Sequence, residues 1–390
     1  MNYGNLRRFL LASAGSALML LAANSAGATG APPAAPPSLC ANGKCVATST
    51  GTIKWHPGHY LSATDRAFYG TAASGRMLQS SLAKSIDNES AIQGIQQMYT
   101  WAALEPQKGQ YDFSQITSDL KYLHSLPTPK RLIINLVGQE YGGLIANGAN
   151  AVSYFPQYLV DEGRVVDFDY GFVATVWDPA TMDRMVALIQ ALGAAFDSDP
   201  LVEAFVYEGE TSLGFSKGTP SGYSIGGFIA QYQRWITAAR AAFPTTNVAA
   251  MTNWLPPGGT ETLLGQIIAT AAQVKAGFGQ PDIEPTVQGD WGQDYTIGAN
   301  GMPSYKGKVP LVYQVQYPGA VHFGTASQIF SYGVDTLGAT HIIWQYTAPG
   351  EGFTTDWTWG TGVLPLIRQQ NGRTVTACPT LLAGSCNTGG

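Results

Sequence analysis

The stretch QQMYTWAALEPQKGQYDF, residues 96–113, decides the fold. Its first residues favour a β-strand, and Pro106 then interrupts the backbone hydrogen-bonding pattern and opens a polar loop. Asp112 or Ser114 can cap the amphipathic stretch from Ile116 to Leu126 as a helix. The stretch therefore predicts a strand, a long loop and a helix in that order. The alternative is that this stretch is an ordinary strand-helix connection, in which the aromatic residues serve packing alone.

This alternation continues along the chain. Segments of strand-forming residues predict strands at 52–56, 94–101, 131–138, 202–208, 247–253, 277–283, 309–317 and 341–346. Segments with helical periodicity predict helices at 113–126, 180–196, 225–243, 261–275, 326–337 and 363–370. Eight strands with intervening helices favour an α/β protein with a single (β/α)8 TIM barrel. A doubly wound open sheet is the alternative, but it normally has fewer strands and a glycine-rich phosphate turn.

The N-terminal residues have the features of an export signal. Arg7 and Arg8 precede an apolar run, and the small residues around Ala28 fit a cleavage site. The arginine pair also allows twin-arginine export as an alternative route. We expect an exported protein, periplasmic or extracellular, without a transmembrane segment. The predicted organisation is a signal peptide at 1–28, a Pro- and Ala-rich spacer at 29–39, and a barrel with cysteine-containing terminal segments at 40–390.

Four cysteines lie in two close pairs near the ends of the exported chain: Cys40 with Cys45, and Cys378 with Cys386. In an oxidising compartment such cysteines are expected to form disulfides. Two local bridges are favoured. Bridges that tie the N-terminal to the C-terminal segment are the alternative, because a closed barrel brings its ends together. Neither pair has the spacing of a zinc knuckle, so no metal is expected.

The composition argues against charged partners. Only 12% of residues are charged, against about 25% in typical domains, while 11% are aromatic and the formal net charge is −5. Nucleic acid is therefore not an expected partner. Uncharged, aromatic surfaces suit neutral saccharides, although a large secreted domain with many loops would have a similar composition. We expect a carbohydrate substrate, no cofactor and a monomer.

Barrel enzymes place their active site at the C-terminal ends of the strands. The predicted strand ends carry many aromatic and polar residues, which could stack on a sugar ring or bind its hydroxyl groups. Five of the nine tryptophans are candidate stacking surfaces, and we expect about three of these five to face the cleft: Trp55, Trp101, Trp254, Trp291 and Trp344. His56 and His59, near the first strand, are too few and wrongly spaced for a barrel metal site. The candidate substrate-binding residues are Trp55, His56, His59, Trp101, Glu140, Asn253, Trp254, Trp291, Gln314, Gln316 and Trp344.

The motif from Tyr99 to Phe113 and the eighth-strand Trp344 resemble the superfamily of (β/α)8 glycoside hydrolases that includes family 5 cellulases and family 42 β-galactosidases. The resemblance covers the whole barrel in architecture, but only these short motifs are specific. It implies that Trp344 forms a sugar platform and that Glu105 is structural. It also implies an acid/base glutamate at the end of strand four and a nucleophilic glutamate at the end of strand seven.

The fourth strand provides two candidates for the acid/base residue. Glu208 and Glu210 are two residues apart, so on a strand both side chains would point to the same face. We favour Glu210 as the general acid because it lies further toward the mouth. Gly209 stands where the superfamily usually has asparagine. Two exposed loop acids are the alternative interpretation.

The seventh strand departs from the superfamily pattern. It offers the neutral amides Gln314 and Gln316, which cannot form a glycosyl ester. The second carboxylate could come from another strand, the enzyme could invert with water, or the barrel could bind sugar without cutting it. Asp282 and Glu284 at the end of the sixth strand are the best replacement as catalytic residues, although they could equally cap a loop or bind a substrate hydroxyl group. Glu140, at the start of a long insertion after the third strand, is next.

The function predicted from these residues is an exported glycoside hydrolase that cleaves a poly- or oligosaccharide by carboxylate acid/base catalysis. Glu210 would be the general acid, with a second carboxylate from strand six or three. The alternative is a catalytically silent carbohydrate-binding barrel, favoured by the glutamines of strand seven. A lyase or transglycosylase on the same scaffold is a weaker alternative.

Overall fold

The computed structural model describes two compact units, Met1–Thr48 and Ser49–Gly390. In the first, strands β1 (Cys40–Ala41) and β2 (Lys44–Cys45) pair antiparallel, with Cys40 opposite Cys45. The predicted signal peptide and spacer lie outside the described residues. Those residues are 40–41, 44–45, 52–62, 86–140, 154–169, 171–208, 211, 213–253, 256–285, 302–316, 324–347 and 354–389.

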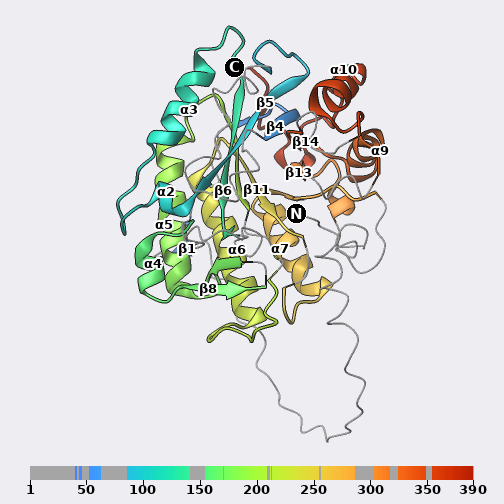
Figure 1. The fold of residues 1–390 in the computed structure, drawn as a ribbon. Helices are drawn as coiled ribbons and strands as arrows, with labels where there is room; N and C mark the ends of the chain where they lie inside the picture. Colours follow the sequence, from blue (N-terminus) through green and yellow to red (C-terminus); the bar gives the residue numbers. More distant parts are fainter. Residues whose placement is uncertain are drawn as a thin grey trace, which may run out of the picture. The chain divides into compact units, whose positions relative to one another are not determined.

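Eight parallel strands form a closed barrel in the second unit, which confirms the predicted fold (Figure 1). Each strand pairs in parallel with the next around the barrel, with a register shift in the pairs of the first with the second strand and of the third with the fourth, and the last strand closes on the first. In chain order they are β4 (Gly58–Ser62), β5 (Ile92–Thr100), β6 (Arg131–Val137), β10 (Val202–Glu208), β11 (Asn247–Met251), β12 (Gly277–Gln280), β13 (Leu311–Val315) and β14 (His341–Gln345).

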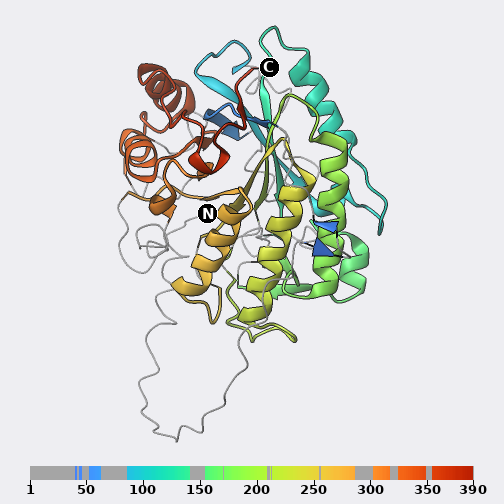
Figure 2. The same ribbon diagram turned by 180° about the vertical axis from the view of Figure 1, so that it is seen from behind.

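Amphipathic helices cover the barrel. In the helix at 179–196, buried Met182, Met185, Ile189 and Leu192 recur at helical spacing, and the Asp178 side chain caps its N-terminus. Figures 1 and 2 show α3 and α5 on one side of the barrel and α9 and α10 on the other. The helices are α2 (Trp101–Leu104), α3 (Ser114–His124), α4 (Gln157–Asp161), α5 (Pro179–Phe196), α6 (Ile225–Ala242), α7 (Glu261–Gln273), α9 (Ala326–Ser331) and α10 (Leu364–Gln369).

Several short helical turns complete the unit. They are the 3-10 helices η4 (Met302–Tyr305) and η8 (Thr380–Leu382) and the π-helices η6 (Tyr332–Leu337) and η7 (Trp359–Val363). The predicted helix at 326–337 is therefore an α-helix that continues as a π-helix. Among the described residues, no helix has both the length and the apolar character needed to cross a membrane.

The barrel interior changes character along its axis. Its middle is filled by a cluster of buried residues that face inward from their strands: Tyr60, Ile133, Ala204, Val206, Ala249, Met251, Val312 and Ile343. Two residues further along β6, β10 and β13, the next inward positions are Asn135, Glu208 and Gln314. The apolar core thus ends in a polar layer at the C-terminal mouth, where barrel enzymes hold their active sites.

The prediction of the first strand was wrong. The segment predicted at 52–56 contains only the two-residue strand β3 (Ile53–Lys54), which pairs with β15 (Cys386–Asn387) outside the barrel. The first barrel strand begins instead at Gly58, whose φ of 153° disfavours any residue with a side chain. A Cβ there would lie 2.5 Å from Gln93 Cγ. Pro57 and Gly58 therefore mark the entry to the strand, where the sequence suggested its end.

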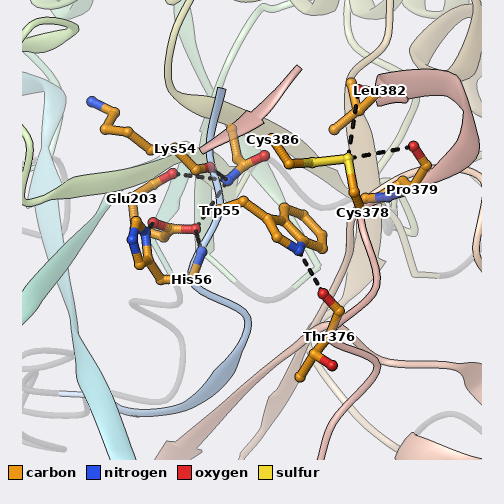
Figure 3. Close-up of a disulfide and its surroundings, with 10 residues drawn as sticks. Lys54, Trp55, His56, Glu203, Thr376, Cys378, Pro379, Leu382 and Cys386 are labelled. Atoms are coloured by element: carbon orange, nitrogen blue, oxygen red, sulfur yellow. Dashed lines mark hydrogen bonds and ion pairs between the residues drawn. A yellow bond between two sulfur atoms is a disulfide. The ribbon is translucent and has the colours of Figure 1, made fainter. Parts of the chain in front are cut away.

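The pairing of β3 with β15 ties the end of the chain to the N-terminal end of the barrel (Figure 3). A disulfide between Cys378 and Cys386 holds the C-terminal segment beside Trp55, whose indole N–H donates to the Thr376 carbonyl at 2.8 Å. This bond confirms one of the two predicted local bridges. It also excludes the alternative in which the N- and C-terminal segments are cross-linked, because Cys378 and Cys386 are paired with each other.

A small antiparallel sheet follows β6, within the long insertion predicted after the third strand. Strand β7 (Gln139–Glu140) pairs with β9 (Gly171–Ala174), which pairs in turn with β8 (Val165–Phe168). The insertion therefore has secondary structure of its own. It holds Glu140 directly beyond the C-terminal end of a barrel strand.

Candidate active site

A pocket opens inside the C-terminal mouth of the barrel. Its lining comes from β4, β5, β13, Gln316 just after it, and β14, which are neighbours around the barrel. Four of these residues carry side-chain amides and none carries a charge. The lining residues are Ser62, Gln96, Met98, Gln314, Val315, Gln316, Ile343 and Gln345.

Glu208 lies at this mouth as the last residue of β10. Its side chain is only 6% exposed. The Asn135 amide donates a hydrogen bond to Glu208 Oε2, and Gln316 Nε2 donates to Glu208 Oε1 at 3.3 Å. Gln316 Nε2 also donates to Gln314 Oε1 at 2.8 Å. The strand-four glutamate is therefore held by amides from strands three and seven.

Three amide side chains at this mouth leave buried polar atoms without partners among the described residues. Gln96 is fully buried, and neither its Nε2 nor its Oε1 forms a hydrogen bond. Asn135 Oδ1 and Gln314 Nε2 are likewise unpartnered. Buried polar atoms in native proteins nearly always have a partner, so a cluster of exceptions calls for a physical explanation.

Glu140 is a second buried carboxyl group at the C-terminal side of the barrel. It is 2% exposed, and the Tyr154 backbone N–H donates to its Oε2 at 3.3 Å. Burial raises the pKa of Glu140 to about 7, against the smaller opposing effect of that hydrogen bond. The pKa of the Tyr154 hydroxyl is raised by burial and then by the charges of Glu140 and Glu208. Both carboxylates therefore lie within electrostatic reach of one tyrosine.

The structure describes Glu208 and Thr211 but neither of the two residues between them, Gly209 and Glu210. Thr211 is fully buried. The backbone N–H of Asn253 donates to Thr211 Oγ1 at 3.0 Å. Asn253, a predicted substrate-binding residue, is thus buried after β11 and ties the segment after β10 to that strand. The predicted Trp254 and Trp291 also lie outside the described residues.

The two carboxylates predicted after strand six are described. Asp282 and Glu284 are both half-buried just beyond β12. Glu284 lies near Tyr332 of η6, because its charge adds to burial in raising the pKa of that tyrosine. Ile283 between them is buried and packs near Gly333 of the same segment. This contact places the segment next to the helical layer.

Two of the predicted substrate-binding residues lie at the opposite end of the barrel from the pocket. Trp55 is 1% exposed, and its ring makes an edge contact with His341, the first residue of β14. His56 Nδ1 lies 2.8 Å from Glu203 Oε2, near the start of β10 (Figure 3). Because the first barrel strand starts after these residues, the structure places both of them away from the mouth.

His59 and Trp344 lie between the barrel and its helices. Both are fully buried, and His59 Nδ1 accepts the indole N–H of Trp344 at 2.9 Å. Burial lowers the pKa of His59 to about 4, so the ring is neutral and its Nε2 donates to the Arg373 carbonyl at 3.2 Å. The His59 ring stacks on Phe330 of α9. The structure therefore leaves Trp344 no open face for a sugar.

Trp101 is fully buried as well, at the end of β5. Its indole N–H donates to Glu105 Oε2 at 2.8 Å. The Tyr158 hydroxyl and the Gly109 backbone N–H also donate to Glu105, at 2.9 Å and 2.7 Å, and Arg184 forms an ion pair with it. Glu105 therefore holds the loop after β5 in place, as the family resemblance implies.

Sequence reasoning missed several residues of the pocket. Ser62 and Gln345 lie two residues beyond the inward-facing Tyr60 and Ile343 on the same strands, so they face the barrel interior as well. Gln96 pairs with Ser62 on the neighbouring strand and faces the same interior. Alternation along the strands could have identified them once the register was known. Asn135 was hidden in the apolar run RLIINLVG, where a single amide looks like a minor interruption of a buried strand.

Comparison with known proteins gives structural neighbours only. No protein-family model and no curated protein matches the chain. Endo-glycoceramidase II from Rhodococcus sp., as its lactosyl-enzyme intermediate, matches with a TM-score of 0.50 and 14% identity, over 82% of this chain and 80% of that one. Its complex with a cellobiose-like isofagomine gives 0.50 and 13%, over 85% and 84%.

A GH5_18 enzyme from Streptomyces cattleya, in complex with Manb1-4GlcNAc, matches with a TM-score of 0.49 and 12% identity, over 83% of each chain. At such low identity, a structural match reflects the fold alone. The two endo-glycoceramidase II structures, at a TM-score of 0.50, therefore show a likeness in the (β/α)8 barrel fold.

Proposed function

We propose that this protein is an exported glycoside hydrolase that cleaves a poly- or oligosaccharide with carboxylate groups at the barrel mouth. The observation that carries the proposal is Glu208, a buried carboxylate that faces inward at the end of strand four, among uncharged amides. The fold it shares with the glycosidases above is consistent with this chemistry. The predicted signal peptide and the Cys378–Cys386 bond support export.

Glycoside hydrolysis needs one protonated carboxylic acid and one carboxylate. Burial raises the pKa of Glu140 to about 7, so this group can keep a proton at neutral pH and give it to a leaving oxygen. Glu208 accepts hydrogen bonds from the amides of Asn135 and Gln316, an arrangement that suits an ionised carboxylate. Glu140 as acid and Glu208 as base or nucleophile therefore form a chemically complementary pair.

Glu210 remains the other candidate for the acid. It is two residues beyond Glu208, and Thr211 after it is anchored to Asn253. Gln314 and Gln316 stand at the end of strand seven, where the superfamily resemblance implies a nucleophile, and neither has a carboxylate; Gln316 instead donates to Glu208. We infer that both catalytic carboxyl groups come from strands three and four. Asp282 and Glu284 are assigned the weaker proposal of contacts to the substrate.

The test measures reducing ends released from a panel of neutral oligosaccharides by the wild type and by Glu140→Gln, Glu208→Gln and Glu210→Gln. The control is Glu162→Gln, since Glu162 lies on the surface in ion pairs with Lys108 and Arg164. Glu208→Gln and one of the two acid variants should lower kcat at least about 100-fold, and the control should change it less than twofold. Cleavage that survives Glu208→Gln refutes the assignment. Glycans that bind without any product would favour the silent barrel.

A further inference from the structure

The pocket beside Glu208 has a donor and acceptor pattern that the protein itself does not satisfy. Gln96 offers an unpartnered N–H group and an unpartnered carbonyl oxygen, both fully buried. Gln314, in the same lining, adds an unpartnered N–H group. Asn135 is not part of that lining but donates to Glu208, which also accepts from the lining residue Gln316, and it has an unpartnered carbonyl oxygen. Leaving such atoms without partners costs free energy, which is recovered only when a ligand or an ordered water supplies the missing hydrogen bonds.

The orientation of these groups is fixed by their other contacts. Gln314 uses its Oε1 to accept from Gln316, so its Nε2 is the end left over for a ligand. Asn135 uses its Nδ2 to donate to Glu208, so its Oδ1 is left over. Gln96 lines the pocket at the position paired with Ser62 of the neighbouring strand. The result is a mixed set of donors and acceptors, which matches sugar hydroxyl groups because each can donate and accept.

The charge of the surroundings selects among polar ligands. The lining of the pocket contains amides, a hydroxyl and apolar side chains, without a cation to pair with an anionic group. The Glu208 carboxylate is hydrogen-bonded to the amides of Asn135 and Gln316, and Gln316 lines the pocket. Burying a second anion there would cost its hydration and add repulsion. A uronic acid, phosphate or sulfate group is therefore disfavoured.

We propose that Gln96, Gln314 and Asn135 form a subsite that binds the hydroxyl-bearing edge of an uncharged sugar beside Glu208. The inference rests on the proposed function, because it names the class of substrate that the same mouth accepts. It assigns a binding role to Gln96, a residue without any catalytic group. It also assigns a role to the glutamines of strand seven: Gln316 orients Glu208 and Gln314 by donating a hydrogen bond to each.

The test uses Gln96→Met, which keeps the length of the side chain and removes its amide. The matched control is Gln97→Met, because Gln97 is the next residue of β5, is equally buried and points to the opposite face. Binding to cellotetraose, mannotetraose, galactotetraose and tetragalacturonic acid is measured by calorimetry with the full-length protein. The melting temperature of each unliganded variant is measured in parallel.

The wild type should bind at least one neutral tetrasaccharide, and at least tenfold more tightly than tetragalacturonic acid. Gln96→Met should weaken that binding at least tenfold, and Gln97→Met less than twofold. Unliganded Gln96→Met should melt no lower than the wild type, because it loses an unsatisfied amide; a purely structural role would lower its melting temperature. Unchanged affinity in Gln96→Met, preference for the uronic acid, or no binding at all would overturn the subsite.

The outcomes separate this inference from the proposed function. If a neutral sugar binds through Gln96 but is never cleaved, the proposed hydrolase activity is refuted and the proposed subsite stands. If cleavage depends on Glu208 but is unchanged by Gln96→Met, the proposed subsite is refuted and the proposed hydrolase activity stands.

Discussion

Gln316 Nε2 donates to Glu208 Oε1 at 3.3 Å, and this hydrogen bond joins the ends of strands seven and four across the barrel mouth. A carboxylate in place of the Gln316 amide would face Glu208 at the same distance. The glutamine therefore allows Glu208 to be ionised without a second negative charge beside it. This relationship has a direct consequence for stability.

Gln316→Glu should destabilise the protein more at pH 8 than at pH 5. Two ionised carboxylates this close repel, whereas at lower pH they can share a proton. We expect a loss of roughly 1–3 kcal/mol at pH 8, the equivalent of one or two units of pKa. Urea unfolding at both pH values measures it. The control Gln190→Glu, on the exposed face of α5, should change stability by less than about 0.5 kcal/mol. An equal loss at both pH values would contradict the explanation.

Glu140→Gln should stabilise the protein above pH 7. The pKa of Glu140 rises from its ordinary 4.5 to about 7 in the folded state because the group is buried. The folded state therefore holds a proton that the unfolded chain releases, and wild-type stability falls as the pH rises from about 4.5 through 7. The loss amounts to roughly 3 kcal/mol at pH 8, and the neutral variant should not show it.

Unfolding of the wild type and Glu140→Gln, followed from pH 5 to pH 8, checks this expectation. The surface variant Glu162→Gln serves as the control, since ion pairs lower the pKa of that group and its effect should be small and of opposite sign. Parallel stability curves for the wild type and Glu140→Gln would show that burial does not raise the pKa of Glu140.

The barrel could be predicted from the sequence because strands and helices are recognised from local patterns of residues. Strand and helix periodicity recur along the chain, and segments such as RLIINLVG at Arg131 form strands where expected. The direction of a side chain depends on register, which local patterns do not give. Trp344 follows a strand pattern at the expected end, yet it faces the helices and bonds to His59, while its neighbour Gln345 faces the pocket.

Glu203 shows the same limit at the other end of the barrel. By alternation with Ala204 and Val206 it should face the helices. The register between β6 and β10 shifts between Val202 and Ala204, and such an irregularity re-aims the side chain of the extra residue. Glu203 is consequently fully buried against His56 and His341. An irregularity of this kind leaves no signature in the composition of a strand.

Glu203→Gln should lower stability by roughly 2–4 kcal/mol at pH 7 without lowering kcat. The carboxylate accepts hydrogen bonds from His56, His341 and Asn247, and losing one partner of such a buried cluster is costly. Burial opposes its ionisation, but the histidine contacts win and lower its pKa to about 2. Its contribution is therefore complete above about pH 4.5 and should disappear as the pH falls toward 2.

Acid unfolding of the two proteins provides the measurement. The wild type should lose stability between pH 4.5 and pH 2 more steeply than Glu203→Gln, and kcat at pH 7 and 20 °C should agree within about twofold. A large drop in kcat with unchanged stability would contradict this prediction. It would mean that Glu203 takes part in the reaction, although it lies at the opposite end of the barrel from the proposed active site.

Removing the Cys378–Cys386 bond by the double substitution Cys378→Ser and Cys386→Ser should destabilise the barrel from its N-terminal end. The bond closes a loop with a sequence separation of 8, for which chain entropy predicts a loss of about 2–3 kcal/mol. Without it, non-covalent contacts alone hold the segment, among them the short pairing of β15 with β3, the Trp55 contact to Thr376, and the backbone hydrogen bonds from Thr380 to Gly307 and from Leu381 to Lys308. Reductant should lower the melting temperature of the wild type to that of the double variant measured in the same reductant, because a bridge between Cys40 and Cys45 would be reduced in both proteins. Glycan binding should be unchanged well below melting, because the pocket lies at the opposite end; weakened binding at 20 °C would show that the terminal segment reaches the site.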